Sequence, residues 1–496
     1  MKRFLTLALV GAVMLGAGSV AYANVCAFDP VPAATLLFPF VTYNYTLEDA
    51  GYNTLFAVTN VSNEATIAHV TVWTDWSFPL LDFNILLTGY DVQTMSIRDI
   101  LRDGQLPVTV LASHNKTVLE DGPVAGGNPY AAFDPPNLPN PQDTNDLGGD
   151  RCQASWDAYP GKYEDNPIPP AYLDYFQGFL QASQIADRAH QNCDSSDPYV
   201  PEDAQGNMPW FEARTASDDT WMYITIDVVE TCSKVFPDEG QYYSEELRFE
   251  NILMGDVIYV NQTARLSEAE NAVQIEADGA LPFITTLIGN EEGDWASFYA
   301  RYADRFGLDD YREPLPTAWA FRYMQDPDIG LSTLIRAWKG STTLESIPDL
   351  FVYHPVIDLP PVEFWAKNCL AYTYYVWDED ENVSTSSQYP WSGGPGEPAS
   401  LNLFPLETQE VSVDMLNTID PYGWMLFIWP NSNFAGPEVG GDWYQTWMGV
   451  QYAKVNSQSG EPEYSAFRNG HVMANYNCFS SQVLPDLGFF FRPPLD

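Results

Sequence analysis

The sequence predicts an all-β protein made of two tandem homologous β-sandwiches of Ig-like or jelly-roll type. Short runs of β-branched and aromatic residues alternate with turn-forming residues along much of the chain. Several patterns of the first half also recur in the same order in the second half. With 496 residues, the chain exceeds the roughly 250 to 300 residues at which a single hydrophobic core usually stops growing.

Five patterns recur, and each has the composition of a β-strand. Their common order predicts an internal duplication, with a β-bulge widening the last copy by one residue. The pairs are Thr54-Leu55-Phe56 with Thr333-Leu334-Ile335; Val72-Trp73 and Asp75 with Val376-Trp377 and Asp378; Gln93 to Ile97 with Gln409 to Val413; Trp221-Met222 with Trp424-Met425; and Met254-Gly255 and Val260-Asn261 with Met448-Gly449 and Val455-Asn456.

The N-terminus has the three-part pattern of a cleavable export signal. Lys2-Arg3 precede the apolar run from Phe4 to Leu15, and small residues follow up to Ala21-Tyr22-Ala23. We therefore expect residues 1–23 to be a signal peptide. No later apolar stretch approaches the roughly 20 residues that span a bilayer, so the expected product is exported to the periplasm or the cell exterior, without a membrane span.

The first sandwich is expected over residues 24–290. His69, Thr71 and Trp73 alternate with Val70 and Val72, which predicts a strand that carries His69 partly exposed rather than as a ligand or base. Turn formers follow the strands at Asn60 to Asn63 and at Thr88-Gly89.

A large insertion is expected in the first sandwich at about residues 103–218. Gln93 and Trp221 are 128 residues apart, whereas Gln409 and Trp424 are 15 apart. Most of the insertion is Pro- and Gly-rich and typical of loops. One helix is expected after Pro169-Pro170, on the apolar stripe Tyr172, Tyr175, Phe176 and Phe179.

A helical linker is expected over residues 291–327, followed by the second sandwich over 328–496. Gly307 would end the linker helix, whose apolar stripe is Trp295, Phe298, Tyr299, Tyr302 and Phe306. In the second sandwich, the run from Ala371 to Trp377 is typical of a strand, and Ser384 to Ser400 is typical of an exposed loop.

One part of the chain resembles a known group of proteins. The segments are Thr54 to Asn60, Val72-Trp73-Thr74-Asp75, Leu81-Asp82-Phe83 and Thr88 to Gln93. They are similar to uncharacterised exported bacterial proteins that have no assigned activity. The resemblance implies export and β structure, and it implies no chemistry.

Charge is the strongest compositional signal. The chain has 67 acidic and 22 basic residues and a formal net charge of −45. Nucleic acid is excluded as a partner because phosphate binding needs clustered Lys and Arg, and an anionic membrane surface is disfavoured for the same reason. The acidic surface of the protein itself favours either solubility through self-repulsion or capture of divalent cations. With 45% apolar residues the chain can still bury a core.

The cysteines predict disulfides, because an even number in an exported chain favours cross-links. Proximity in sequence favours Cys152 with Cys193, and Cys369 with Cys478 would close the second sandwich on itself, leaving Cys26 with Cys232. Metal binding is the alternative, although no CxxC motif is present. The six cysteines are Cys26, Cys152, Cys193, Cys232, Cys369 and Cys478.

Two acidic clusters are candidate Ca²⁺ sites. Asp143, Asn145, Asp146 and Asp150 present oxygen ligands in a Gly-containing loop, although their spacing departs from the EF-hand loop. Asp378-Glu379-Asp380-Glu381 follows the second tryptophan strand. The alternative for both clusters is an ordinary solvated loop.

No catalytic or cofactor motif is present, since GxSxG, HExxH, P-loop and GxGxxG patterns are all missing. We therefore expect a non-catalytic exported protein that binds a glycan, a cell-surface polymer or a protein, or that has a structural role. The alternative is a secreted polysaccharide hydrolase that uses paired carboxylates. Aromatic residues that could stack on sugars, or be buried in the core instead, are Tyr389, Trp391, Trp443, Tyr444 and Trp447.

If the loop with Asp143 and Asp150 binds Ca²⁺, adding the ion to chelator-treated protein should raise its melting temperature. A ligand that binds only the folded state stabilises that state. An unchanged melting temperature at millimolar Ca²⁺ would exclude the site.

If disulfides hold the mature chain, thiol titration of the denatured, unreduced protein should find almost no free cysteine. The same titration after reduction is the control and should find all six thiols. A large thiol signal before reduction would contradict the cross-links.

Overall fold

The structure is a computed structural model. It describes residues 30–46, 50–75, 77, 79–107, 219–230, 237, 240–277, 298–299, 310–313, 315–340, 372–388, 404, 407–413, 420–429, 445–455 and 462–472. All six cysteines, the cluster from Asp143 to Asp150, the signal segment and the helix expected after Pro170 lie outside these residues.

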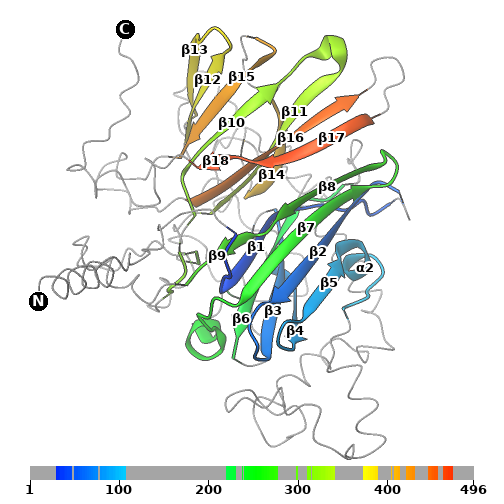
Figure 1. The fold of residues 1–496 in the computed structure, drawn as a ribbon, viewed down its shortest axis with the longest axis vertical. Helices are drawn as coiled ribbons and strands as arrows, with labels where there is room; N and C mark the ends of the chain where they lie inside the picture. The colour runs from blue at the N-terminus through cyan, green and yellow to red at the C-terminus, as the bar shows by residue number, and fades with distance from the viewer. Residues whose placement is uncertain are drawn as a thin grey trace, which may run out of the picture.

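The described chain is an all-β sandwich protein, as the sequence predicts, and Figure 1 shows two stacked groups of sheets. In the first group, a five-stranded sheet of order β4-β3-β6-β1-β9 accompanies a four-stranded sheet of order β5-β2-β7-β8. The strands are β1 (Thr35–Val41), β2 (Tyr52–Asn60), β3 (Thr66–Thr74), β4 (Pro79–Leu87), β5 (Val92–Ser96), β6 (Met222–Val229), β7 (Leu253–Asn261), β8 (Leu266–Asn271) and β9 (Val273–Ile275).

The second group has sheets of order β13-β12-β15-β10-β18 and β14-β11-β16-β17. Its strands are β10 (Ala318–Met324), β11 (Leu331–Gly340), β12 (Tyr372–Asp378), β13 (Val383–Gln388), β14 (Thr408–Ser412), β15 (Tyr422–Ile428), β16 (Gln445–Val455), β17 (Pro462–Asn469) and β18 (His471–Val472). Adding nine to each strand number of the first group therefore gives the strand order of the second.

Helical structure is confined to short pieces in the described residues. Helix α2 (Ile97–Leu101) begins at Ser96, whose side chain accepts a hydrogen bond from the Asp99 amide. A π-helix, η3 (Tyr242–Glu246), and a 3₁₀ turn, η5 (Pro327–Ile329), complete the set.

Side-chain alternation explains which faces are buried. In β2, Phe56 and Val58 are buried, whereas Leu55 is exposed and Ala57 half-buried, as expected for a sheet with one face on the core. Strands β1, β3 and β6 are buried along their whole length, so the middle of their sheet is covered on both faces.

Local hydrogen bonds repeat between the two sandwiches. Thr54 Oγ1 accepts from Thr42 N at 3.0 Å and donates to Thr42 O at 2.8 Å. Thr333 Oγ1 makes the same pair of bonds with Met324, at 2.9 and 2.8 Å. The connections β1–β2 and β10–β11, each of which joins strands of two different sheets, are therefore built alike.

Strand pairing corrects two of the five sequence matches. Tyr223 lies opposite Trp73, and Trp424 lies opposite Trp377, so Trp424 occupies the place of Tyr223 and not of Trp221. A shift of two residues keeps every side chain on its own face, so an alternating pattern cannot detect it.

The match on β7 is one residue out at Met254-Gly255 and two residues out at Val260-Asn261. Val58 and Ala337 hold equivalent places on β2 and β11, and they pair with Gly255 and Met448 respectively. Two-residue matches such as these recur by chance, so they did not fix the register.

Three further expectations were wrong. His69 is fully buried, because Tyr242 and other residues cover the outer face of its sheet. Residues 384–388 belong to strand β13, which pairs with β12, rather than to an exposed loop. The linker expected over 291–327 already contains strand β10 from Ala318 onward.

The linker residues that the structure describes contact both sandwiches. Phe298 and Tyr299 lie in a turn, and the remaining residues of the expected helical stripe lie outside the described part. Phe298 stacks on Trp338 of β11 at 5.7 Å, and Tyr299 lies 6.3 Å from Trp73 of β3.

Candidate functional site

The two sandwiches meet where β11, β14 and β17 of the second contact β1, β6 and β8 of the first. Thr408 Oγ1 donates to Pro39 O at 2.6 Å, and the Glu407 amide donates to Asp75 O at 2.9 Å. Trp338 packs edge-on against Tyr223 at 5.8 Å. We call this contact the junction.

Arg336 of β11 is the central cation of the junction. Its guanidinium lies over the rings of Phe40 at 4.7 Å and Tyr259 at 4.6 Å, both in the first sandwich. Its Nε donates to Glu410 Oε2 at 2.9 Å, and its Nη1 lies 3.5 Å from Glu268 Oε2 on β8. Ring faces and carboxylates together stabilise the buried charge.

Glu270 adds a second carboxyl to the junction. One of its oxygens, Oε1, lies 3.0 Å from Tyr259 OH, which donates a hydrogen bond to Phe40 O at 2.7 Å. Burial of the carboxyl raises the pKa of Glu270 to about 8, although the positive charge of Arg336 opposes the rise.

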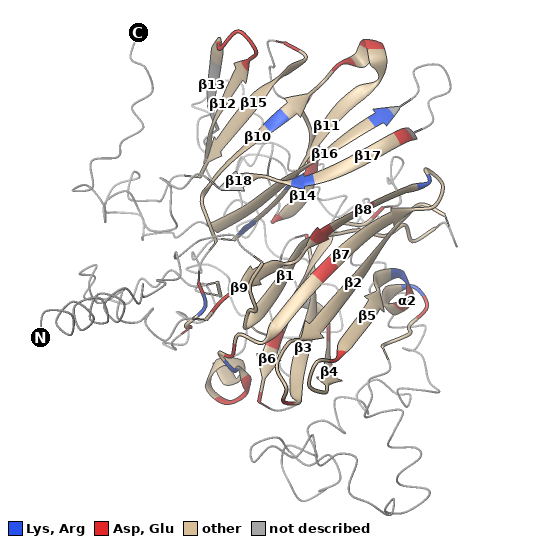
Figure 2. Cartoon of the chain, viewed as in Figure 1, with Lys and Arg blue, Asp and Glu red and all other residues tan. Residues whose placement is uncertain are grey.

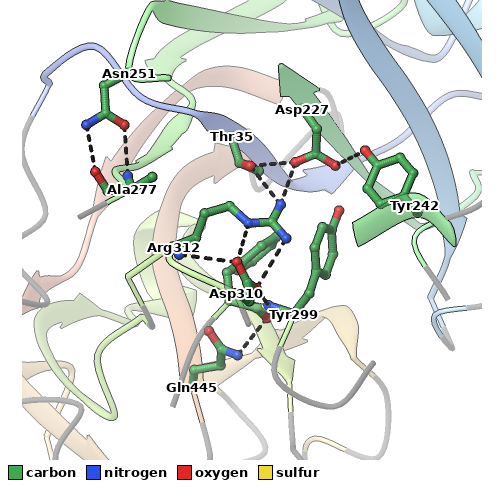
Figure 3. A network of polar contacts seen from close by, with 10 residues as sticks. Thr35, Asp227, Tyr242, Asn251, Ala277, Tyr299, Asp310, Arg312 and Gln445 are labelled. Atoms are coloured by element: carbon green, nitrogen blue, oxygen red, sulfur yellow. Dashed lines mark hydrogen bonds and ion pairs between the residues drawn. The ribbon is translucent and has the colours of Figure 1, made fainter. Parts of the chain in front are cut away.

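A second buried network lies in the first sandwich (Figure 3). Asp227 of β6 accepts hydrogen bonds from Thr35 and Tyr242, each at 2.5 Å, and from Arg312 Nη1 at 2.7 Å. Arg312 also holds Asp310 through its Nε at 2.8 Å. Burial raises the pKa of Asp227, against the charge of Arg312.

This network anchors the chain that precedes the second sandwich. Arg312 is fully buried, and its guanidinium lies 4.2 Å from the Tyr299 ring centre. Because a buried charge without its partner is strongly unfavourable, the network fixes Arg312 against the five-stranded sheet. We assign it a structural role.

His69 belongs to the same buried sheet face. Its Nδ1 lies 3.1 Å from Asn84 Oδ1, and its Nε2 lies 3.6 Å from Asp82 Oδ2. Burial lowers the pKa of His69, while the charge of Asp82 opposes that shift. The imidazole is therefore held neutral and enclosed, without access to a substrate.

The candidate functional site is a groove of about 1230 Å³ on the second sandwich. Strands β10, β15, β16 and β17 and the β12–β13 turn contribute to it. Its aromatic lining is Phe321, Tyr323, Tyr422, Trp424 and Tyr452, and its charged lining is Arg322, Arg468, Asp378, Glu379 and Glu381.

Trp424 forms an aromatic wall of the groove. It stacks face to face on Trp377, with ring centres 3.8 Å apart and planes 6° apart. Trp377 in turn stacks on Tyr375 at 5.5 Å. The two tryptophans are direct neighbours on β12 and β15, which is the arrangement in which cross-strand aromatic pairs stabilise a sheet.

Two arginines line the groove together with Trp424. Arg322 and Arg468 are both exposed, on β10 and β17. Burial raises the pKa of Tyr452 between them, and the charges of Arg468 and Arg322 oppose that rise. Figure 2 shows that basic residues are sparse on the described surface, so two in one groove form a distinct local feature.

The acidic rim of the groove is the β12–β13 turn. Asp378 accepts hydrogen bonds from the backbone and the side-chain amide of Asn382, both at 2.8 Å, and these bonds lower the pKa of its carboxyl. Loss of water and the charge of Asp378 raise the pKa of Asp420, which shares a hydrogen bond with Asp378.

The structure gives the Asp378–Glu381 run a turn-forming role. Within the described ranges, no group of three His, Cys, Asp or Glu side chains is arranged to hold a metal ion. Asp143, Asn145, Asp146 and Asp150 fall outside those ranges, so a Ca²⁺ site there stays a prediction.

Of the aromatic residues expected to stack on sugars, only Trp447 is described, and it is 1% exposed in the core. Sequence reasoning missed the groove itself, because Arg322, Trp424 and Arg468 come from three separate strands. The tryptophan repeat was the one signal that pointed to Trp377 and Trp424.

No protein-family model, curated protein or solved structure matches this chain. In the part of the chain that is described, every helix is too short or too polar to cross a membrane.

We expect Glu270 to make the folded state less stable as pH rises from about 5 to about 8. In this range the folded protein keeps a proton that the unfolded chain, with a carboxyl pKa of 4.5, has released. Each pH unit should then cost up to about 1.4 kcal/mol of unfolding free energy. The measurement is urea denaturation at several pH values.

Glu270→Gln keeps the uncharged form and should flatten this pH dependence. Asp256→Asn, which removes an exposed carboxylate from the neighbouring strand β7, is the matched control and should keep the wild-type slope. A wild-type slope in E270Q would show that another group is responsible.

Proposed function

We propose that this chain is a non-catalytic exported protein that acts by binding, and that the groove on the second sandwich is its binding site. The observation that carries this proposal is an asymmetry between equivalent aromatic pairs. Trp73 and Tyr223 are buried in the first sandwich, whereas Trp377 and Trp424 remain half-buried beside a groove.

We also infer that the two sandwiches arose by internal duplication. Their common strand order and the repeated Thr54 and Thr333 hydrogen bonds support this origin. Duplicated units that keep one fold while their surfaces diverge are a usual route to a new binding surface, because function resides in exposed segments.

The lining of the groove favours a polypeptide over a glycan. Aromatic residues and Arg are the side chains enriched at protein–protein interfaces. A sugar would need exposed ring faces to stack on, and of the two paired tryptophans only Trp424 lines the groove, because Trp377 stacks on both Trp424 and Tyr375.

A polysaccharide hydrolase is the second candidate, because Asp378 and Asp420 pair at the rim with opposite pKa shifts. Their separation argues against it. Glycosidases place their two carboxyls about 5 to 9.5 Å apart, to hold the sugar and a water, whereas these two share a direct hydrogen bond. Asp378 is also engaged by Asn382.

The test selects peptides from a random display library on the immobilised mature chain. Peptides bound in the groove should bind Trp424→Ala at least about tenfold more weakly than wild type, as expected when a central aromatic contact is removed. Tyr464→Ala, which removes an exposed ring on β17 outside the groove lining, is the control and should bind like wild type. Circular dichroism checks that both variants fold.

A panel of soluble polysaccharides gives the contrary outcomes. A fluorescence change that depends on Trp424 would assign the groove to glycans, and release of reducing sugar on the same samples would make the protein a hydrolase. Peptide binding that survives Trp424→Ala would remove the groove as the site.

A further inference from the structure

We propose that the polypeptide bound in the groove is a second copy of this chain, which docks the outer face of its β5-β2-β7-β8 sheet there. This inference rests on the proposed function of the groove. It follows from comparing the junction inside the chain with the equivalent surfaces that remain open.

The junction joins two unlike surfaces. The second sandwich contributes the outer face of its four-stranded sheet, where Arg336, Gln451 and Thr408 are buried. The first sandwich contributes the end at which β1 meets β7, including Phe40, Tyr259 and the edge strand β8. We call these two surfaces the face and the end.

The groove is the end of the second sandwich. Tyr452 OH donates to Arg322 O at 2.8 Å, just as Tyr259 OH donates to Phe40 O at 2.7 Å, so Arg322 occupies the place of Phe40.

The rest of the groove corresponds in the same way. Trp377 and Trp424 pair as Trp73 and Tyr223 do. Arg468 lies opposite Val450 as Glu270 lies opposite Val257, and these two valines pair with the equivalent residues Ile335 and Phe56. The groove of the second sandwich is therefore equivalent to the end of the first sandwich. The end of the first sandwich is covered at the junction, whereas the groove is open.

The face of the first sandwich is also left open. Leu55, Val92 and Ile258 are 37%, 54% and 42% exposed, and they are three of the seven large hydrophobic residues that the described chain exposes. Val92 and Ile258 hold the places of the buried Thr408 and Gln451. Apolar side chains gathered on one sheet face are typical of an interaction surface.

Charge makes the two open surfaces complementary. At the junction, Arg336 of the face lies 3.5 Å from Glu268 of the end. The open surfaces place the opposite charges the other way round: the open face carries the exposed Asp256, and the open end carries Arg322 and Arg468 beside the carboxylates of its β12–β13 rim.

Copies of a chain with a net charge of −45 repel one another, so association needs such a local attraction. Each copy carries one open face and one open end. When the face of one copy docks on the end of another, the growing assembly still has one free face and one free end. Such contacts therefore produce open chains or closed rings rather than a symmetric dimer.

Sedimentation velocity of the mature chain tests the proposal. The weight-average mass should rise with concentration past that of two copies, and added salt should weaken the association because part of the attraction is between exposed charges. A chain that stays monomeric up to about 1 mM, where even with a Kd of that size about 40% of the contacts would be formed, would overturn the proposal.

A charge exchange identifies the surfaces. Asp256→Arg and Arg322→Asp should each weaken association at least about tenfold, since each places like charges across the contact. An equimolar mixture of these two variants should associate again, because every contact in the alternating chain regains opposite charges. Glu245→Arg and Arg265→Asp alter exposed charges outside both surfaces and should associate like wild type.

Association that neither variant weakens, or that the mixture does not restore, would overturn the proposal. The proposed function fails separately. If the selected peptides require Trp424 but the chain is monomeric, the groove is a binding site for another protein and not for a second copy. A chain that associates through Asp256 and Arg322 supports both.

Discussion

Burial of the Arg336 guanidinium at the junction is the constraint on which the arrangement of the two sandwiches depends. The charge lies over the rings of Phe40 and Tyr259 and is held by carboxylates of both sandwiches, Glu410 and Glu268. Losing these rings or Glu268 while the sandwiches stay packed would leave the cation buried without its partners, and an uncompensated buried charge costs several kcal/mol. The two sandwiches are therefore parts of one packed unit, and the described core runs through both.

The same constraint explains why two sandwiches of one topology have different surfaces. Because the face of the second sandwich is used to cover the end of the first, only the first face and the second end remain open. The first sandwich is closed further by Arg312, which brings the preceding chain onto Asp227. The second sandwich has Ala318 and Ile428 where the first has Thr35 and Asp227, so it has no equivalent network.

The sequence was sufficient to predict the fold class, because alternation and β-branched composition are local properties of each strand. It predicted the equivalence of β3 with β12 and of β2 with β11 for the same reason. It did not predict that His69 is buried, since burial depends on Tyr242 and on residues far along the chain that cover that sheet face. The groove could not be predicted, because it exists only where Arg322, Trp424 and Arg468 are brought together by strand order.

Glu270 in the first sandwich and Arg468 in the second hold equivalent positions but carry different charges. This difference disfavours docking of the Arg336 face on the end of the second sandwich in place of the end of the first. If both ends were acidic, the Arg336 face of one molecule could dock on the groove of another as well as on its own first sandwich, and exchange between molecules would follow. With Arg468 and Arg322 in the groove, that face would meet like charges, which disfavours the wrong pairing. In the association proposed above, a face that carries a carboxylate, such as Asp256, would meet these arginines with the opposite charge, so the internal and external contacts would remain distinct although they share one geometry.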